Sequence, residues 1–178
     1  RESIKSLPES HENLQGEFIS MEGIFRHLQV ITGAYMAFSL GANDVGNSAG
    51  PFGAIYSVMK SGVLTLKLEL PTWVLLVAGL GIALGMFTWG YRVMEVLGKK
   101  ITEMTPSRGF SAEFGAATTV LVASKLGLPI STSHTIVGAV IGVGLARGMG
   151  ALNLRMISNI IKSWLLTVPL TAGLSVVF

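Results

Sequence analysis

The sequence predicts an all-α integral membrane protein that contains a broken transmembrane helix and a re-entrant helical hairpin. Hydrophobic residues make up 50% of the 178 residues, while charged residues make up only 13%, roughly half the share that is usual in soluble domains. The mean hydropathy is +0.61. The 22 glycines suit helices that pack closely or break inside a membrane.

The charge and cysteine content exclude several classes of protein. The chain has no cysteine, which excludes disulfides and thiol chemistry. Its net charge of +3 is small and spread over loops, so we expect membrane lipid rather than nucleic acid as a partner. The chain starts at Arg1 without a signal peptide, and we expect that it begins inside a longer protein.

Residues 1–26 form the first predicted unit, a polar loop or surface helix that precedes the membrane part. Five glutamates lie in this segment, and Pro8 and Gly16 should prevent a long helix. We expect residues 27–178 to form the transmembrane part of the chain.

The apolar run 28–59 is interrupted by the polar stretch 41–51, where Asp44 is the one formal charge. A continuous helix over 28–59 would be roughly 48 Å long, which exceeds the ~30 Å hydrocarbon core of a bilayer. Three glycines and Pro51 lie in the polar stretch. We therefore expect two half-spans, 28–41 and 52–59, that are separated by an irregular segment.

Two further runs predict spans, and a basic connection predicts the topology. Residues 73–91 are uncharged, and residues 157–178 are largely apolar. The connection 92–109 is the most basic long loop, which places it in the cytoplasm and the connection 60–70 outside. Between the spans, the short apolar pieces 110–126 and 130–147 meet at Gly127, Leu128 and Pro129. These favour a re-entrant hairpin whose tip lies in the membrane. Two short full spans are the alternative, because they would return Arg147 to the same side of the membrane.

The first candidate site is the polar stretch itself. Asp44, Asn43, Asn47 and Ser48 provide hard oxygen ligands that suit Na⁺, and the amides and the hydroxyl can also donate to an oxyanion. An acid in a membrane segment is by default a functional candidate. The simpler alternative is that one of these residues only caps a half-helix.

The second candidate site is the run from Ser131 to Thr135, which opens the helix after Pro129. Hydroxyls and free N–H groups at a helix N-terminus can bind an anion such as phosphate. Capping by one of the hydroxyls is the simpler alternative. Ser133 and His134 point about 100° apart on a helix, so a Ser/His hydrolase is disfavoured.

Glu113 and Thr118 are candidates on the first arm of the hairpin. Glu113 could balance a cation or carry a proton, or it could form a surface pair with Arg108. Thr118 and Thr119 could add hydroxyl ligands, although bonding back to their own helix is more common.

Two motifs carry a resemblance to a known family. Both motifs, with Glu113 lying 18 residues before Ser131, resemble the PiT inorganic phosphate transporters over roughly residues 28–178. The first is Gly41-Ala42-Asn43-Asp44-Val45-Gly46-Asn47-Ser48 with Gly50-Pro51, and the second is Gly127-Leu128-Pro129-Ile130-Ser131-Thr132-Ser133-His134-Thr135-Ile136-Val137-Gly138.

The resemblance implies that this chain is one half of an inverted-repeat transporter. Members of the family have two repeats, each with one copy of both motifs, and Gly50-Pro51 is typical of the C-terminal repeat. We therefore expect the N-terminal half of the same transporter as a partner across a pseudo-two-fold axis. We also expect a homo-oligomer and a multi-pass location in the plasma membrane.

The resemblance further implies sodium-coupled symport of inorganic phosphate by alternating access. The chain would not be an enzyme and would need no cofactor beyond Na⁺ as the coupling ion. Some relatives carry a histidine where this chain has Leu40, which favours Na⁺ over H⁺. The alternatives are a proton-coupled phosphate or sulfate permease and a membrane subunit that binds or senses anions without transport. The expected phosphate residues are Asn43, Ser48, Ser131, Thr132 and Ser133, and the expected sodium residues are Asp44, Asn47, Glu113 and Thr118.

Overall fold

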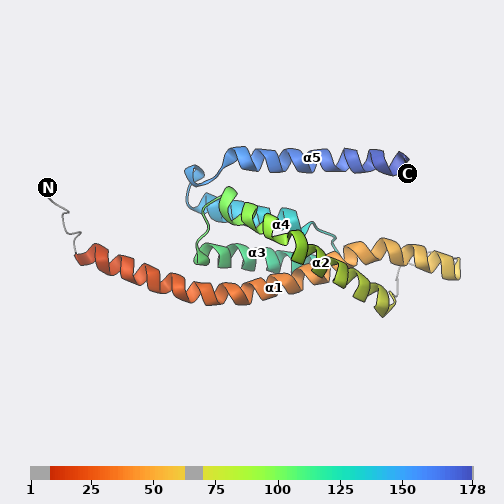
Figure 1. The fold of residues 1–178 in the computed structure, drawn as a ribbon, viewed down its shortest axis with the longest axis horizontal. Coiled ribbons are helices and arrows are strands. Elements are labelled where there is room, and N and C mark those ends of the chain that lie inside the picture. Colours follow the sequence, from red (N-terminus) through yellow and green to blue (C-terminus); the bar gives the residue numbers. More distant parts are fainter. Residues whose placement is uncertain (1–8, 63–69, 178) are drawn as a thin grey trace.

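The computed structural model describes residues 9–62 and 70–177, and every regular element in these two ranges is a helix. This confirms the all-α class. Figure 1 shows α1 running along the whole length of the molecule, with the other helices beside it. The elements are α1 (Glu9–Ser61), α2 (Thr72–Glu95), a π-helical turn (Val96–Lys100), α3 (Pro106–Lys125), α4 (Thr132–Ala146), a 3₁₀ turn (Met149–Ala151) and α5 (Leu154–Val177).

The predicted break at 41–51 is wrong: α1 is continuous over 53 residues, with Pro51 inside it. At 1.5 Å per residue the helix is about 80 Å long. The polar stretch stays helical, and its buried polar side chain, Asn43, bonds to Ser124 of α3 and to the Ile130 carbonyl between α3 and α4. Ser48 donates its hydroxyl back to the carbonyls of Asp44 and Val45.

The expectation that Gly16 would prevent a long helix in the N-terminal segment is wrong. The helix begins at Glu9, contains Gly16, and continues past residue 26 without an end. Of the two forms that we expected for this segment, the described part is helical. The functional division at residue 26 stays a prediction, and residues 1–8 lie outside the described ranges.

The predicted helical hairpin is present as α3 and α4. Gly127 has a φ of 72°, the left-handed conformation that glycine adopts without a Cβ penalty. The Leu128 N–H donates to the Ala123 carbonyl (2.9 Å) and the Gly127 N–H to the Ser124 carbonyl (3.1 Å). This Schellman pattern ends α3 and turns the chain towards α4.

Small side chains allow α3 to lie close to both α1 and α4. Ala112, Ala116, Ala117 and Val120 are each at most 1% exposed, and the spacing of Ala112, Ala116 and Val120 places them on one face of α3. Met36 of α1 packs against Ala116 and Ala117. The close approach brings the polar side chains of α1 within reach of those on α3 and the hairpin.

Glu22 of α1 caps the N-terminus of α3. The Ser107 N–H donates to its Oε2 (2.9 Å), and the Ser107 hydroxyl donates to its Oε1 (2.6 Å). The hydroxyl bond is the main cause that lowers the pKa of the Glu22 carboxyl below its ordinary value. A carboxylate is also favourable at the positive end of a helix.

The two predicted spans after α1 are helices of the expected length. Among the described residues, Thr72–Lys100 and Leu154–Val177 are long and apolar enough to cross a membrane. Few of their side chains are buried within this chain, so their apolar surfaces are available to lipid or to other protein. The Trp73 ring lies edge-on to Phe52 and Tyr56, which connects the start of α2 to the last turns of α1.

Candidate functional site

The two motifs meet where α1 passes the tip of the hairpin. Thr132 is 8% exposed, and its hydroxyl lies 3.3 and 3.2 Å from the two carboxylate oxygens of Asp44, to which it donates. These residues are 88 positions apart in the chain. The structure therefore brings together an acid from the first motif and a hydroxyl from the second.

Asn43 also connects α1 to the hairpin tip. Its side chain is 5% exposed, and its Nδ2 donates to the Ile130 carbonyl (2.9 Å) and to Asp44 Oδ1 (3.1 Å). Its Oδ1 accepts from the Ser124 hydroxyl (3.3 Å). Because Ile130 precedes the first turn of α4, Asn43 holds the hairpin tip against α1.

Ser131 caps α4, as the simpler alternative for this motif predicted. Its Oγ accepts from the His134 N–H at 3.3 Å and lies 2.6 Å from the Nδ1 of the same residue. Spacing of three residues places Ser131 and His134 on one side of the first turn. The adjacent residues Ser133 and His134 share no such bond among the described contacts.

Glu113 lies in a second polar cluster, away from Asp44. Its Oε2 accepts from the Thr32 hydroxyl (2.7 Å), and its Oε1 accepts from Gln29 Nε2 (3.4 Å). Thr32 and Asp44 are twelve residues apart on α1, which is about 18 Å along a helix. Within this chain, Glu113 and Asp44 therefore do not share one ion site.

Glu113 also does not form the surface pair with Arg108 that we considered. Arg108 instead donates to the Glu103 carbonyl at 3.0 Å. Thr32 is 4% exposed, so the cluster of Glu113, Thr32 and Gln29 lies at a buried part of the α1–α3 contact. Gly109 is buried beside it, and a Cβ at that position would displace the Gln29 amide.

The remaining predicted site residues are Thr118, Asn47, Ser48 and Ser133, and they differ in whether their side chains form hydrogen bonds. Thr118 donates back to the Phe114 carbonyl (2.7 Å) and lies 3.5 Å from the Tyr35 hydroxyl. Asn47, Ser48 and Ser133 are exposed. Ser48 uses its hydroxyl on its own helix, so Asn47 and Ser133 are the predicted residues that point outward with no hydrogen bond among those described.

Four partners in these clusters did not follow from the sequence: Gln29, Thr32, Ser124 and the His134 ring. Gln29 and Thr32 are polar residues three apart at the start of an apolar run, which could have marked a buried polar pair. The spacing of Ser131 and His134 could likewise have indicated their contact. No pattern in the sequence indicated the contact of Ser124 with Asn43.

Clusters of three or more His, Cys, Asp or Glu residues that could hold a metal are absent from the described parts of the chain. A site for Na⁺ here would use neutral oxygens around one acid instead. Asp44 is an acid of this kind, because the side chains around it carry amide and hydroxyl groups, whose oxygens are hard ligands.

Comparisons with known proteins agree with the two motifs. The sequence model of the phosphate transporter family matches residues 6–175. A protein of Thermococcus kodakarensis named as a phosphate permease is 58% identical over 89% of this chain and 39% of its own length. A protein of Arabidopsis thaliana named inorganic phosphate transporter 2-1, chloroplastic, is 49% identical over 88% of this chain and 27% of its own length.

A solved structure supports the fold. A chain described as the sodium-dependent phosphate transporter superposes with a TM-score of 0.77 and 51% sequence identity, covering 85% of this chain and 38% of that one. This chain thus spans about two fifths or less of the length of these relatives. The relatives are named permeases and transporters, which confirms the expectation that the chain is not an enzyme. The chain belongs to the phosphate transporter family.

Proposed function

We propose that this chain forms one repeat of a sodium-coupled inorganic phosphate symporter that works by alternating access. The observation that carries the proposal is the contact of Asp44 with Thr132, because it joins the acid of one motif to the hairpin tip of the other. The family match supports phosphate as the substrate. The structural neighbour is described as a sodium-dependent phosphate transporter and is 51% identical to this chain, which supports sodium as the coupling ion.

In the proposed site, Na⁺ binds at Asp44 and phosphate binds at the hairpin tip. The cation would offset the carboxylate charge, which is costly in a low-dielectric site without a partner. The Na⁺ ion would also bind the Asp44 carboxylate oxygens that accept from the Thr132 hydroxyl. That hydroxyl would then be free to donate to phosphate. Asn47 and Ser133 are exposed on the same two motifs, so their donors are available to complete an anion site.

We further propose that the N-terminal half of the same transporter supplies the second half of the site. The chain covers 38% to 39% of two of its relatives, which leaves room in those proteins for another repeat. The hairpin arms α3 and α4 are not among the helices long and apolar enough to cross a membrane. This supports a re-entrant hairpin that is enclosed by protein. Plasma-membrane location and a homo-oligomer are parts of the same proposal.

The test is uptake of ³²P-phosphate by proteoliposomes that contain the complete transporter, with an inward Na⁺ gradient and equal pH on both sides. Asp44→Asn should abolish the Na⁺ dependence, and Thr132→Ala should reduce uptake at least tenfold. The matched controls are Glu103→Gln and Thr88→Ala, because Glu103 is an exposed acid and the Thr88 hydroxyl bonds only to its own helix among the described contacts.

The outcomes separate the candidate functions. Uptake driven by a pH gradient but indifferent to Na⁺ would reassign the coupling ion to H⁺. Uptake of ³⁵S-sulfate in preference to phosphate would change the substrate. Phosphate binding without flux under either gradient would indicate a sensing subunit and contradict symport.

A further inference from the structure

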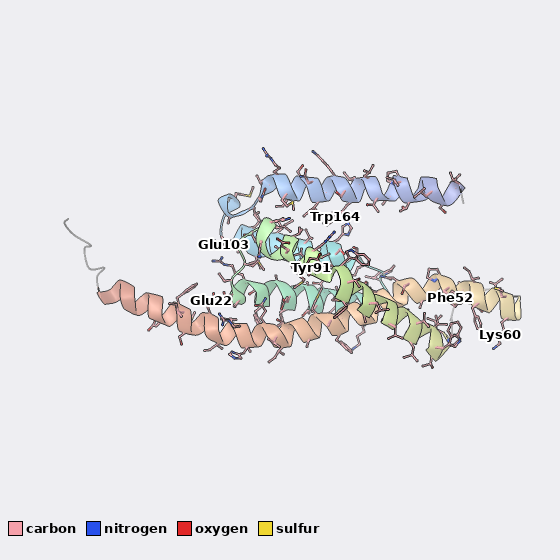
Figure 2. All side chains as sticks on the ribbon, viewed as in Figure 1. Glu22, Phe52, Lys60, Tyr91, Glu103 and Trp164 are labelled. Carbon is pink, nitrogen blue, oxygen red and sulfur yellow. The ribbon has the colours of Figure 1, made fainter. Side chains whose placement is uncertain are left out.

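α5 contacts the hairpin through one face, which ends at Trp164. Met156, Ile157, Ile160 and Trp164 pack against the core of Ile101, Ala112, Val137 and Val140. Their spacing places them on one side of a helix. Figure 2 shows Trp164 on the side of α5 that faces α4.

The Trp164 ring stacks on the His134 ring. Their centroids are 3.8 Å apart and the planes make an angle of 28°. The His134 side chain is otherwise exposed, and an exposed ring would exchange between rotamers. The stack therefore restricts the imidazole to the orientation in which Nδ1 faces Ser131.

His134 makes two contacts with Ser131, one more than a helix cap needs. The backbone N–H bond at 3.3 Å is the cap itself. The Nδ1 contact at 2.6 Å is shorter and comes from the side chain. When Nδ1 carries the ring hydrogen, Ser131 Oγ accepts twice and its own hydrogen is free to donate to an anion.

Ser131 directly precedes Thr132, whose hydroxyl bonds to Asp44. The orientation of the first turn of α4 therefore affects both the Ser131 hydroxyl at the hairpin tip and the contact of Thr132 with Asp44. Two contacts in series connect α5 to Ser131: the Trp164 ring stacks on His134, and His134 bonds to Ser131. Ser131 is in turn joined to Thr132 by a peptide bond.

We propose that His134 and Trp164 are positioning residues for the anion at the hairpin tip. Trp164 fixes the His134 ring, and the ring fixes the Ser131 hydroxyl as a donor towards phosphate. α5 is then a part of the site that touches no ligand. This inference rests on the proposed phosphate transport, and its test includes a readout that needs no transport.

The first readout is hydrogen–deuterium exchange of the peptide over residues 131–136 in the complete transporter in detergent. Trp164→Ala should speed exchange in this peptide severalfold, because the cap at the His134 N–H loosens. Trp164→Phe keeps an aromatic face and should stay close to wild type. Trp89→Ala is the matched control, since Trp89 is 65% exposed on α2.

The second readout is the KM for phosphate in proteoliposomes. Trp164→Ala and His134→Ala should each raise KM about fivefold at an unchanged Vmax, which corresponds to the ~1 kcal/mol of one hydrogen bond. His134→Asn keeps an N–H donor near the Nδ1 position and should raise KM less than His134→Ala. The control Trp89→Ala should leave KM unchanged.

Several results would overturn the inference. An unchanged exchange rate at 131–136 in Trp164→Ala would do so, as would an equal effect of Trp89→Ala. Adding Trp164→Ala to Ser131→Ala should increase exchange no further, and additive effects would show that Trp164 does not act through Ser131. If exchange responds as expected but the wild type takes up no phosphate, the proposed transport fails while the positioning of the tip stands.

Discussion

Asn43 and Asn47 lie one turn apart in the same motif, but their surroundings differ. Asn43 is 5% exposed and bonds to Ile130, Ser124 and Asp44. Asn47 is exposed and has no hydrogen bond among those described. The first is suited to holding the fold together, and the second to meeting a ligand.

Asn43→Ala should therefore destabilise the protein, while Asn47→Ala should impair transport alone. Removing the Asn43 amide leaves the Ile130 carbonyl and the Ser124 hydroxyl without their partner, which costs about 2 kcal/mol. The measurement is the apparent unfolding temperature of the complete transporter in detergent, beside phosphate uptake. A drop of the same size in both variants would contradict the distinction.

The hairpin turn depends on a glycine whose backbone few other residues adopt. Gly127 has a φ of 72°, whereas Gly138 lies inside α4 with open space around its Cβ position. Gly127→Ala should cost about 1–2 kcal/mol because an L-residue is strained in the left-handed region. Gly138→Ala should be neutral or stabilise by about 0.5–1 kcal/mol.

Thermal unfolding of both glycine variants checks this expectation. Because Gly127 also shapes the tip next to Ile130 and Ser131, its substitution should lower uptake even at temperatures where the protein is folded. Equal stability of the two variants would show that the tip does not require the Schellman turn.

The contact between α1 and the start of α3 should make stability depend on pH. The folded pKa of Glu22 lies below its ordinary value, mainly because of the Ser107 hydroxyl. Its contribution is thus present above the ordinary carboxyl pKa and is lost as the pH falls through the lower folded value. Glu22→Gln removes the titrating group at this contact.

The measurement is the unfolding temperature from pH 7 to pH 3 for wild type, Glu22→Gln and Ser107→Ala. The wild type should lose more stability over this range than Glu22→Gln. Ser107→Ala should lie between the two, because it removes the hydroxyl bond but keeps the backbone N–H bond to Glu22. Parallel curves for all three proteins would mean that this cap does not contribute.

At the scale of the whole molecule, α1 connects two ends that are farther apart than a bilayer is thick. Glu22 contacts Ser107 near the base of the hairpin, and Lys60 lies 38 residues further along α1. This separation is about 57 Å, compared with about 40–45 Å for a bilayer with its headgroups. Figure 2 shows Glu103 on the same side as Glu22, and Lys60 at the far end of α1.

Single cysteines at these two ends should report opposite sides of the membrane. This chain has no cysteine of its own, so Glu103→Cys and Lys60→Cys can be introduced into a complete transporter whose other cysteines are replaced. An impermeant maleimide should label Glu103→Cys from the cytoplasmic side and Lys60→Cys from outside, as the basic connection 92–109 predicts. Labelling of both from one side would contradict this topology.

Local signals in the sequence were enough to predict the all-α class, the two long apolar helices and the helical hairpin. An apolar run between polar connections predicted the helix Thr72–Glu95, and glycine and proline at 127–129 predicted the turn after α3. These features depend on residues only a few positions apart, so a single sequence contains them. The two motifs and their order likewise carried the resemblance that the family match confirms.

The same local reasoning was wrong about 41–51, where glycines and Pro51 indicated a break that the structure does not contain. What decides this region is packing: α3 and the hairpin tip give Asn43 and Asp44 partners more than 80 residues away. With those partners in place, the buried polar side chains are satisfied without unwinding the helix.

The membership of each polar cluster was also decided by tertiary structure alone. The sequence by itself determined which residue types were available: an acid, amides and hydroxyls in two motifs, and a further acid at Glu113. The register of α3 against α1 assigned Glu113 to Thr32 and Gln29, and the position of the start of α4 against α1 assigned Asp44 to Thr132. Register depends on the fit of whole helix faces, such as the small residues of α3 against Met36, which no short stretch of sequence specifies.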